Sequence, residues 1–184
     1  WSASNGVLKS TGTSGKNQVL LVDVAINEDN YEITANVVMQ AGGSIGLVFA
    51  NNHYFRLNCS NAANNTYLLS AGYTTENFKS LRTTCAANKQ LGSSYGLVVG
   101  EVATFKLVVE GTTFTVYING QVACTEDTSA RTGDTHGAYA MSNLYGKVGL
   151  LQMNASGEAF GFKDIKVWNS KTAETLYAQW EELP

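Results

Sequence analysis

The sequence predicts an all-β protein built as a sandwich of two antiparallel sheets. Apolar and polar side chains alternate with a period of two along most of the chain, and helical periodicity is hard to find. Charged residues are only 15% of the 184 residues, and Thr, Ser, Asn and Gly replace them, which suits strands and turns better than amphipathic helices. The 18 glycines and a single proline, Pro184, indicate turns built from Gly, Asn and Asp.

The first half of the chain contains several segments with this alternation. The expected strands cover residues 6–10, 19–26, 31–39, 45–49 and 53–58. One face of the third segment carries only Tyr31, Ile33, Ala35, Val37 and Met39. In the last segment, Phe55 and Leu57 point one way, while Tyr54, Arg56 and Asn58 point the other.

The second half contains the strongest hairpin signal. Residues 104–110 alternate, Gly111 marks a tight turn, and residues 113–118 return. Asn119-Gly120 is a second turn leading to a strand over 121–124, so the three strands form a meander. Two more strands are expected, over residues 147–151 and 159–168, and the alternation of the second is broken once, near Lys163.

Three regions lack clean alternation: residues 62–88, residues 127–145 and the tail from Ser170. The first is expected to hold one or two strands around residues 67–73, and the second is a long loop of the kind that is often functional. In total we expect eleven to thirteen strands spaced 8–14 residues apart, which is typical of a sandwich or barrel. No repeat or linker divides the chain, so residues 1–184 are expected to form one domain.

Charge and hydropathy exclude two classes of partner. The net charge is −3 and no Lys/Arg cluster forms a basic stripe, so no nucleic-acid partner is expected. The longest apolar runs are about five residues, far below the roughly 20 needed for a membrane span. Of the three cysteines, Cys59 and Cys85 follow strand-like segments, and the sequence leaves open whether they form a disulfide or stay as buried thiols.

Four stretches together resemble the concanavalin A-like (laminin G-like) superfamily in their order and spacing. They are Tyr31-Glu-Ile-Thr-Ala-Asn-Val, the segment from Gly46 to Leu57, the hairpin from Phe105 to Gln121, and the pair of segments between Gly146 and Val167. Within that superfamily they are similar to family 66 carbohydrate-binding modules. The resemblance implies a jelly-roll sandwich in an extracellular protein, secreted or on the cell surface. It also implies that the domain binds the terminal fructose of levan or inulin and targets a covalently linked glycoside hydrolase to that polysaccharide.

The expected function is non-catalytic binding of oligo- or polysaccharide. The chain lacks the Glu-x-Asp-x-x-Glu run of the sandwich glucanases, and with Pro184 as the only proline it cannot contain the Asn-Asp-Pro-Asn or Arg-Asp-Pro signatures of the family 32 hydrolase domain. Two alternatives stay open. One is a sandwich glycosidase or lyase that uses acids such as Asp23, Glu32 and Glu110, and the other is a protein-binding adhesion domain of laminin G type.

A sugar presents hydroxyl groups and apolar C–H faces, which proteins bind with polar side chains and aromatic rings. The strand positions that point away from the core predict five ligand-binding residues: Glu32, Tyr54, Arg56, Glu110 and Tyr117. The guanidinium of Arg56, held by Glu32 or Glu110, would bridge two adjacent hydroxyls. A cross-strand surface ion pair of little energetic value is the competing interpretation.

The long loop supplies three more predicted ligand-binding residues, Asp134, His136 and Tyr139, with an ordinary solvent-exposed loop as the alternative. No row of tryptophans is visible, which favours a pocket for a terminal sugar over a long groove. Tyr73 and Trp168 are further aromatic candidates for this pocket, and Trp168, at the end of the last strand, has capping of the core as its alternative. No cofactor is expected. A structural calcium at Glu126, Asp127 and Asp134 is left open, although their spacing matches no calcium-binding loop and solvated acids are the favoured interpretation.

Overall fold

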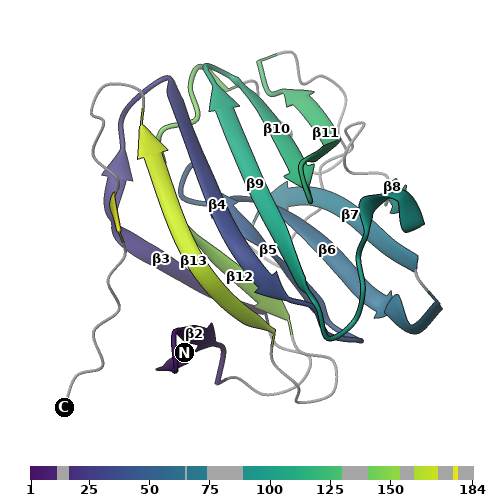
Figure 1. The fold of residues 1–184 in the computed structure, drawn as a ribbon. Helices are drawn as coiled ribbons and strands as arrows, with labels where there is room; N and C mark the ends of the chain where they lie inside the picture. The colour runs from purple at the N-terminus through teal and green to yellow at the C-terminus, as the bar shows by residue number, and fades with distance from the viewer. Residues whose placement is uncertain are drawn as a thin grey trace.

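The computed structural model describes residues 1–11, 17–64, 66–73, 89–129, 141–153, 160–169 and 176–177. Over these residues the chain forms fourteen strands and two short 3₁₀ helices, η1 (Ala62–Asn64) and η2 (Ser93–Tyr95). All strand pairs are antiparallel, and they group into two sheets that lie one behind the other (Figure 1). The predicted all-β sandwich is therefore confirmed. The same residues include no helix whose length and apolar character would let it span a bilayer.

Eight of the described strands form sheet A, and six form sheet B. Sheet A has the order β1 (Ser2–Ser4), β2 (Val7–Lys9), β13 (Gly161–Asn169), β4 (Asn30–Val38), β9 (Val102–Glu110), β10 (Thr113–Ile118) and β11 (Gln121–Asp127), with β14 (Leu176–Tyr177) paired to β13. Sheet B has the order β3 (Asn17–Ile26), β12 (Gly146–Met153), β5 (Ser44–Phe49), β6 (His53–Asn61), β7 (Thr66–Tyr73) and β8 (Lys89–Leu91). The sequence did not predict β1, β8 and β14, because two or three residues are too few to show an alternation.

The core lies between the two sheets and is built by the period-two pattern. In β4, Tyr31, Ile33, Ala35 and Val37 are all buried, and the residues between them are half-buried. Aromatic rings from the two sheets meet across the interface. The Phe49 and Phe114 centroids are 5.0 Å apart, and those of Phe55 and Phe105 are 6.0 Å apart. Each sheet therefore has one face in the core and one outer face.

The meander β9–β10–β11 is confirmed, and its second turn has the local chemistry that the sequence indicated. Asn119 and Gly120 both have positive φ, 48° and 78°, as a two-residue hairpin of type I′ requires. The side chain of Asn119 also fixes the neighbouring loop: its Oδ1 accepts the backbone N–H of Thr104 at 2.8 Å, and its Nδ2 donates to the carbonyl oxygen of Tyr95 at 2.8 Å.

The Cys59–Cys85 disulfide that the sequence left open does not form. Cys59 is a buried free thiol on the inner face of β6, whereas Cys124 on β11 is disulfide-bonded. The Sγ atom of Cys59 lies 3.6 Å from the carbonyl oxygen of Leu57. Burial raises the pKa of the Cys59 thiol to about 12, because the apolar surroundings disfavour the thiolate.

We expect Cys59 to be unreactive toward a thiol-specific disulfide reagent in the native protein at pH 8, and to react fully after denaturation, because the thiolate is the nucleophile. Since the folded-state pKa lies above the ordinary value of 9.0, this group favours folding below pH 9 and its contribution falls as the pH rises toward 12. Thiol counts with and without denaturant test this, with Cys59→Ser as the blank. Equal labelling rates in both states would show that Cys59 is accessible.

Two central strands of sheet B approach their neighbours so closely that only glycine fits. A Cβ atom at Gly46 of β5 would overlap the backbone carbonyl oxygen of Phe55 on β6, and one at Gly149 of β12 would overlap that of Leu20 on β3. Backbone atoms cannot rotate away as the end of a flexible side chain can. These two positions therefore hold the middle of sheet B in its present register.

We expect Gly46→Ala to lower the free energy of unfolding by about 1–3 kcal/mol or more, because the added methyl must displace a paired strand. Gly92→Ala is the matched control: Gly92 has a φ of −84°, and a Cβ there meets no atom within 4 Å. Chemical denaturation of both variants measures the difference. Equal stability of the two variants would contradict the close approach of β5 and β6.

Candidate functional site

The predicted ligand-binding residues do not share one surface. Glu32 on β4, Glu110 on β9 and Tyr117 on β10 lie on the outer face of sheet A. Tyr54 and Arg56 lie on the outer face of sheet B, because β6 pairs with β5 and β7. The two outer faces are separated by the thickness of the sandwich, so the prediction that Glu32 or Glu110 holds Arg56 is wrong. Asp134, His136 and Tyr139 lie outside the described residues.

Arg56 is half-buried and contacts residues of β6 and β7. Its Nε donates to the Oγ of Ser70 on β7 at 3.4 Å, and its guanidinium carbon lies 5.9 Å from the centroid of the Tyr54 ring. Tyr54 is fully buried in a small cluster with Val48 and Leu151 on the outer face of sheet B. The expectation of Tyr54 as a sugar-binding ring is therefore wrong, because the ring is fully buried and packs with apolar residues of neighbouring strands.

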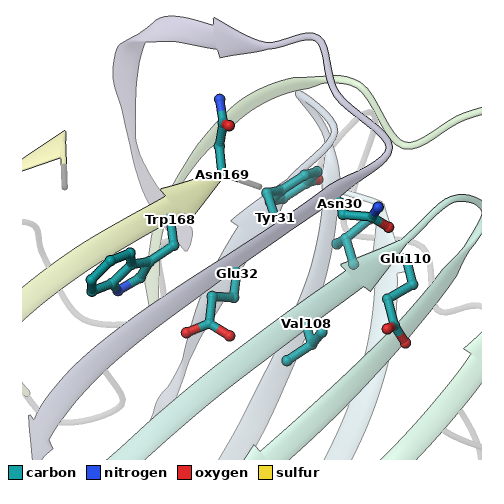
Figure 2. Close-up of a pocket in the computed structure, with 8 residues that line it drawn as sticks. Asn30, Tyr31, Glu32, Val108, Glu110, Trp168 and Asn169 are labelled. Carbon is teal, nitrogen blue, oxygen red and sulfur yellow. The ribbon is translucent and has the colours of Figure 1, made fainter. Parts of the chain in front are cut away.

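A hollow of about 260 Å³ lies on the outer face of sheet A, where the end of β13, the start of β4 and the end of β9 run side by side (Figure 2). It is open to solvent. The lining residues come from these three adjacent strands: Asn30, Tyr31, Glu32, Val108, Val109, Glu110, Trp168 and Asn169. Two of the eight predicted ligand-binding residues, Glu32 and Glu110, are thus brought together.

Strand register sets the arrangement of this hollow. Glu32 pairs with Trp168 on one side and with Val108 on the other, so these three side chains form a row across the sheet. Figure 2 shows the Trp168 ring on one side of Glu32 and the Glu110 side chain on the other. Trp168 is 40% exposed, so it stands on the outer face as an aromatic candidate and does not cap the core. The feature of the sequence that corresponds to the outward direction of Trp168 is the break in the alternation near Lys163.

One lysine neutralises part of the negative charge of the hollow. The Nζ of Lys106 lies 2.9 Å from Oε2 of Glu32 and 5.8 Å from the centroid of the Tyr117 ring. Lys106 therefore links β4, β9 and β10 on the outer face, and Tyr117 contacts this lysine without lining the hollow. At the rim, the Nδ2 of Asn169 donates to Oε1 of Glu28 at 2.6 Å, which orients the Asn169 amide.

Of the acids considered for calcium, Asp127 is engaged in hydrogen bonds. Oδ1 of Asp127 accepts the Oγ1–H of Thr112 at 3.0 Å, and the N–H and Oγ–H of Ser129 at 2.9 and 2.7 Å. These bonds, those from Ser129 first, lower the pKa of Asp127. Within the part of the chain that the structure describes, no three His, Cys, Asp or Glu side chains gather in a way that suits a metal ion. Asp134 lies outside that part.

The hollow can bind a small polar molecule that has an apolar face. Trp168 offers an exposed indole ring, Glu32 and Glu110 offer carboxylate oxygens, and Asn30 offers an amide. Carboxylates and amides bind paired hydroxyls, and an aromatic ring covers C–H groups. Because every lining residue stands on a paired strand, the site is rigid before a ligand arrives.

We expect Lys106→Met to change the free energy of unfolding by less than about 1 kcal/mol, because both partners of the Lys106–Glu32 pair are about one-third exposed, 37% and 32%, and such pairs contribute little. Thermal and urea denaturation of Lys106→Met and Glu32→Gln measure this. A loss of several kcal/mol would mean that the pair holds sheet A together, and variants at the hollow could then not be used to test binding.

No family model matches the chain, and no curated protein matches its sequence. Solved structures do match its fold. The carbohydrate-binding module CBM66 from Bacillus subtilis superposes with a TM-score of 0.56 at 11% identity, over 86% of this chain and 84% of that one. A legume lectin-like domain from Entamoeba histolytica gives a TM-score of 0.60 at 9% identity, over 91% and 85%.

A third similar structure is a Parabacteroides distasonis protein that is provisionally described as a glycosyl hydrolase. It gives a TM-score of 0.60 at 19% identity, over 92% of this chain and 89% of that one. Identities this low show a shared fold and do not carry a shared ligand. The chain therefore shares the β-sandwich fold of these proteins.

Proposed function

We propose that this domain is a non-catalytic carbohydrate-binding module that holds a terminal sugar in the hollow on sheet A. One observation carries the proposal: an exposed tryptophan, Trp168, stands beside the carboxylate of Glu32 in an open hollow built on three paired strands. The likeness of the fold to a carbohydrate-binding module and to a lectin-like domain supports it.

The size of the hollow favours one or two sugar units. Its volume of about 260 Å³ is below the roughly 300–1,000 Å³ of pockets for larger ligands. The fructose end of levan or inulin is the first ligand to test, because the sequence resembles family 66 modules. In this proposal the domain belongs to an extracellular protein and tethers an attached glycoside hydrolase to its polysaccharide.

A glycosidase is the second candidate, because Glu32 and Glu110 share the hollow. Glu110 stands two residues along β9 from Val108, the partner of Glu32, so the two acids are diagonal neighbours on the same outer face. A glycosidase uses two carboxyl groups that flank one sugar. Binding is favoured over hydrolysis for two reasons. Lys106 neutralises Glu32, and Glu110 is exposed to water, whereas a general acid needs apolar surroundings.

A polysaccharide panel separates the two candidates. The protein is incubated with insoluble levan, inulin, cellulose, xylan and chitin, and both its retention on the solid and the release of reducing ends are measured. Retention on at least one polysaccharide without new reducing ends supports the module. Reducing ends that appear with the parent protein and disappear with Glu110→Gln would establish the glycosidase.

We expect Trp168→Ala to weaken binding of the retained glycan about tenfold, because a stacked ring contributes on the order of 1 kcal/mol beyond its buried area. Arg56→Ala is the matched control from the opposite outer face, and it should leave affinity within twofold. Isothermal titration with the soluble oligosaccharide measures both variants. The reverse result, loss with Arg56→Ala alone, would place the site on sheet B and reject the hollow.

A further inference from the structure

Strand β13 contains one residue more than its partner β4 across the same stretch. Lys163 pairs with Asn36, and Lys166 pairs with Thr34. Two residues of β13, Asp164 and Ile165, therefore stand opposite one residue of β4. Asp164 has a φ of 48°, in the left-handed region. The strand thus contains a β-bulge centred on Asp164.

The bulge decides which side chains of β13 face the core. Phe162 and Val167 are 1% and 7% exposed, although they are five positions apart, and an odd number of positions puts two side chains on opposite faces of a regular strand. The extra residue restores the inward direction for Val167 and turns Trp168 outward. In an unbroken ladder that continued from Phe162, Trp168 would point into the core and Val167 would face solvent.

Hydrogen bonds on the outer face hold the bulge in place. The Nδ2 of Asn36 on β4 donates to Oδ2 of Asp164 at 2.9 Å, and the Oγ1 of Thr104 on β9 donates to Oδ1 of Asn36 at 3.0 Å. Three adjacent strands are thereby tied together, four positions from Trp168 along β13 and four positions from Glu32 along β4. Asp, Asn and Gly adopt the left-handed conformation more easily than other residues do, and β-branched residues adopt it with most strain.

We propose that Asp164 is a positioning residue for the sugar site. Its bulge, tied to Asn36, determines which side chains of β13 point outward and thereby brings Trp168 beside Glu32. The proposal rests on the proposed function only for its effect on sugar binding. Its structural part, the exposure of Trp168, can be measured without any glycan.

The test uses a background with one tryptophan, Trp1→Phe/Trp180→Phe, so that fluorescence reports on Trp168 alone. In Asp164→Val, which removes the acceptor and disfavours the left-handed φ, indole emission should shift to shorter wavelength and acrylamide quenching should fall. Affinity for the retained glycan should drop about tenfold, as in Trp168→Ala. Asp164→Asn, which keeps both the conformation and an acceptor, should leave emission unchanged and affinity within twofold.

Deletion of Asp164 is the second variant, and its expected result is the opposite. Without the extra residue, Ile165 falls opposite Ala35 and Lys166 still falls opposite Thr34, so regular pairing alone keeps Trp168 outward. Emission and quenching should then match the background protein. This variant tests the proposal even if Asp164→Val does not fold, because a folded deletion variant with a buried Trp168 would overturn it.

A folded Asp164→Val protein with unchanged emission and quenching would also overturn the proposal. Circular dichroism and thermal denaturation establish that each variant is folded. Failure of the proposed function looks different: Trp168→Ala would keep its affinity for glycan while Asp164→Val still lowered the exposure of Trp168 as expected.

Discussion

The burial of every second side chain between two facing sheets is the constraint on which this structure depends. Rings from sheet A and sheet B meet at Phe49–Phe114 and Phe55–Phe105. The apolar residues of each strand must therefore all point toward the interface between the sheets. The remaining residues of each strand then have only the outer face of their own sheet available. Any site on this molecule that is built from strands must use one outer face or the other.

The two outer faces have become chemically different. Around Tyr54, sheet B carries a second apolar cluster, with Val48 and Leu151 fully buried. Sheet A instead carries polar and charged residues with one exposed indole ring, at Trp168. Sugars need both kinds of contact at once, hydrogen-bonding groups and an apolar surface. That combination makes the outer face of sheet A the better candidate for recognition.

A fold of this kind places few demands on sequence, which explains why structures at 9–19% identity superpose on most of the chain. The core needs residues of suitable size and phase, and many combinations satisfy that need. The outer faces are free to differ, so proteins with this fold can carry different sites. Here the feature that turns the outer face of sheet A into a candidate site is local: one extra residue in β13.

The sequence by itself determined the longer strands, their inward faces, the Asn119-Gly120 turn and the interruption near Lys163, because alternation and turn chemistry are local properties. It could not determine which sheet each strand joins, since that depends on pairing between distant segments. Glu32 and Arg56 have the same outward pattern, yet β4 pairs with β9 and β13 while β6 pairs with β5 and β7. A period of two shows whether a side chain faces the core or the solvent. It does not show on which of the two outer faces an outward side chain lies. Only the tertiary structure therefore separated Arg56 from Glu32 and placed Trp168 beside Glu32.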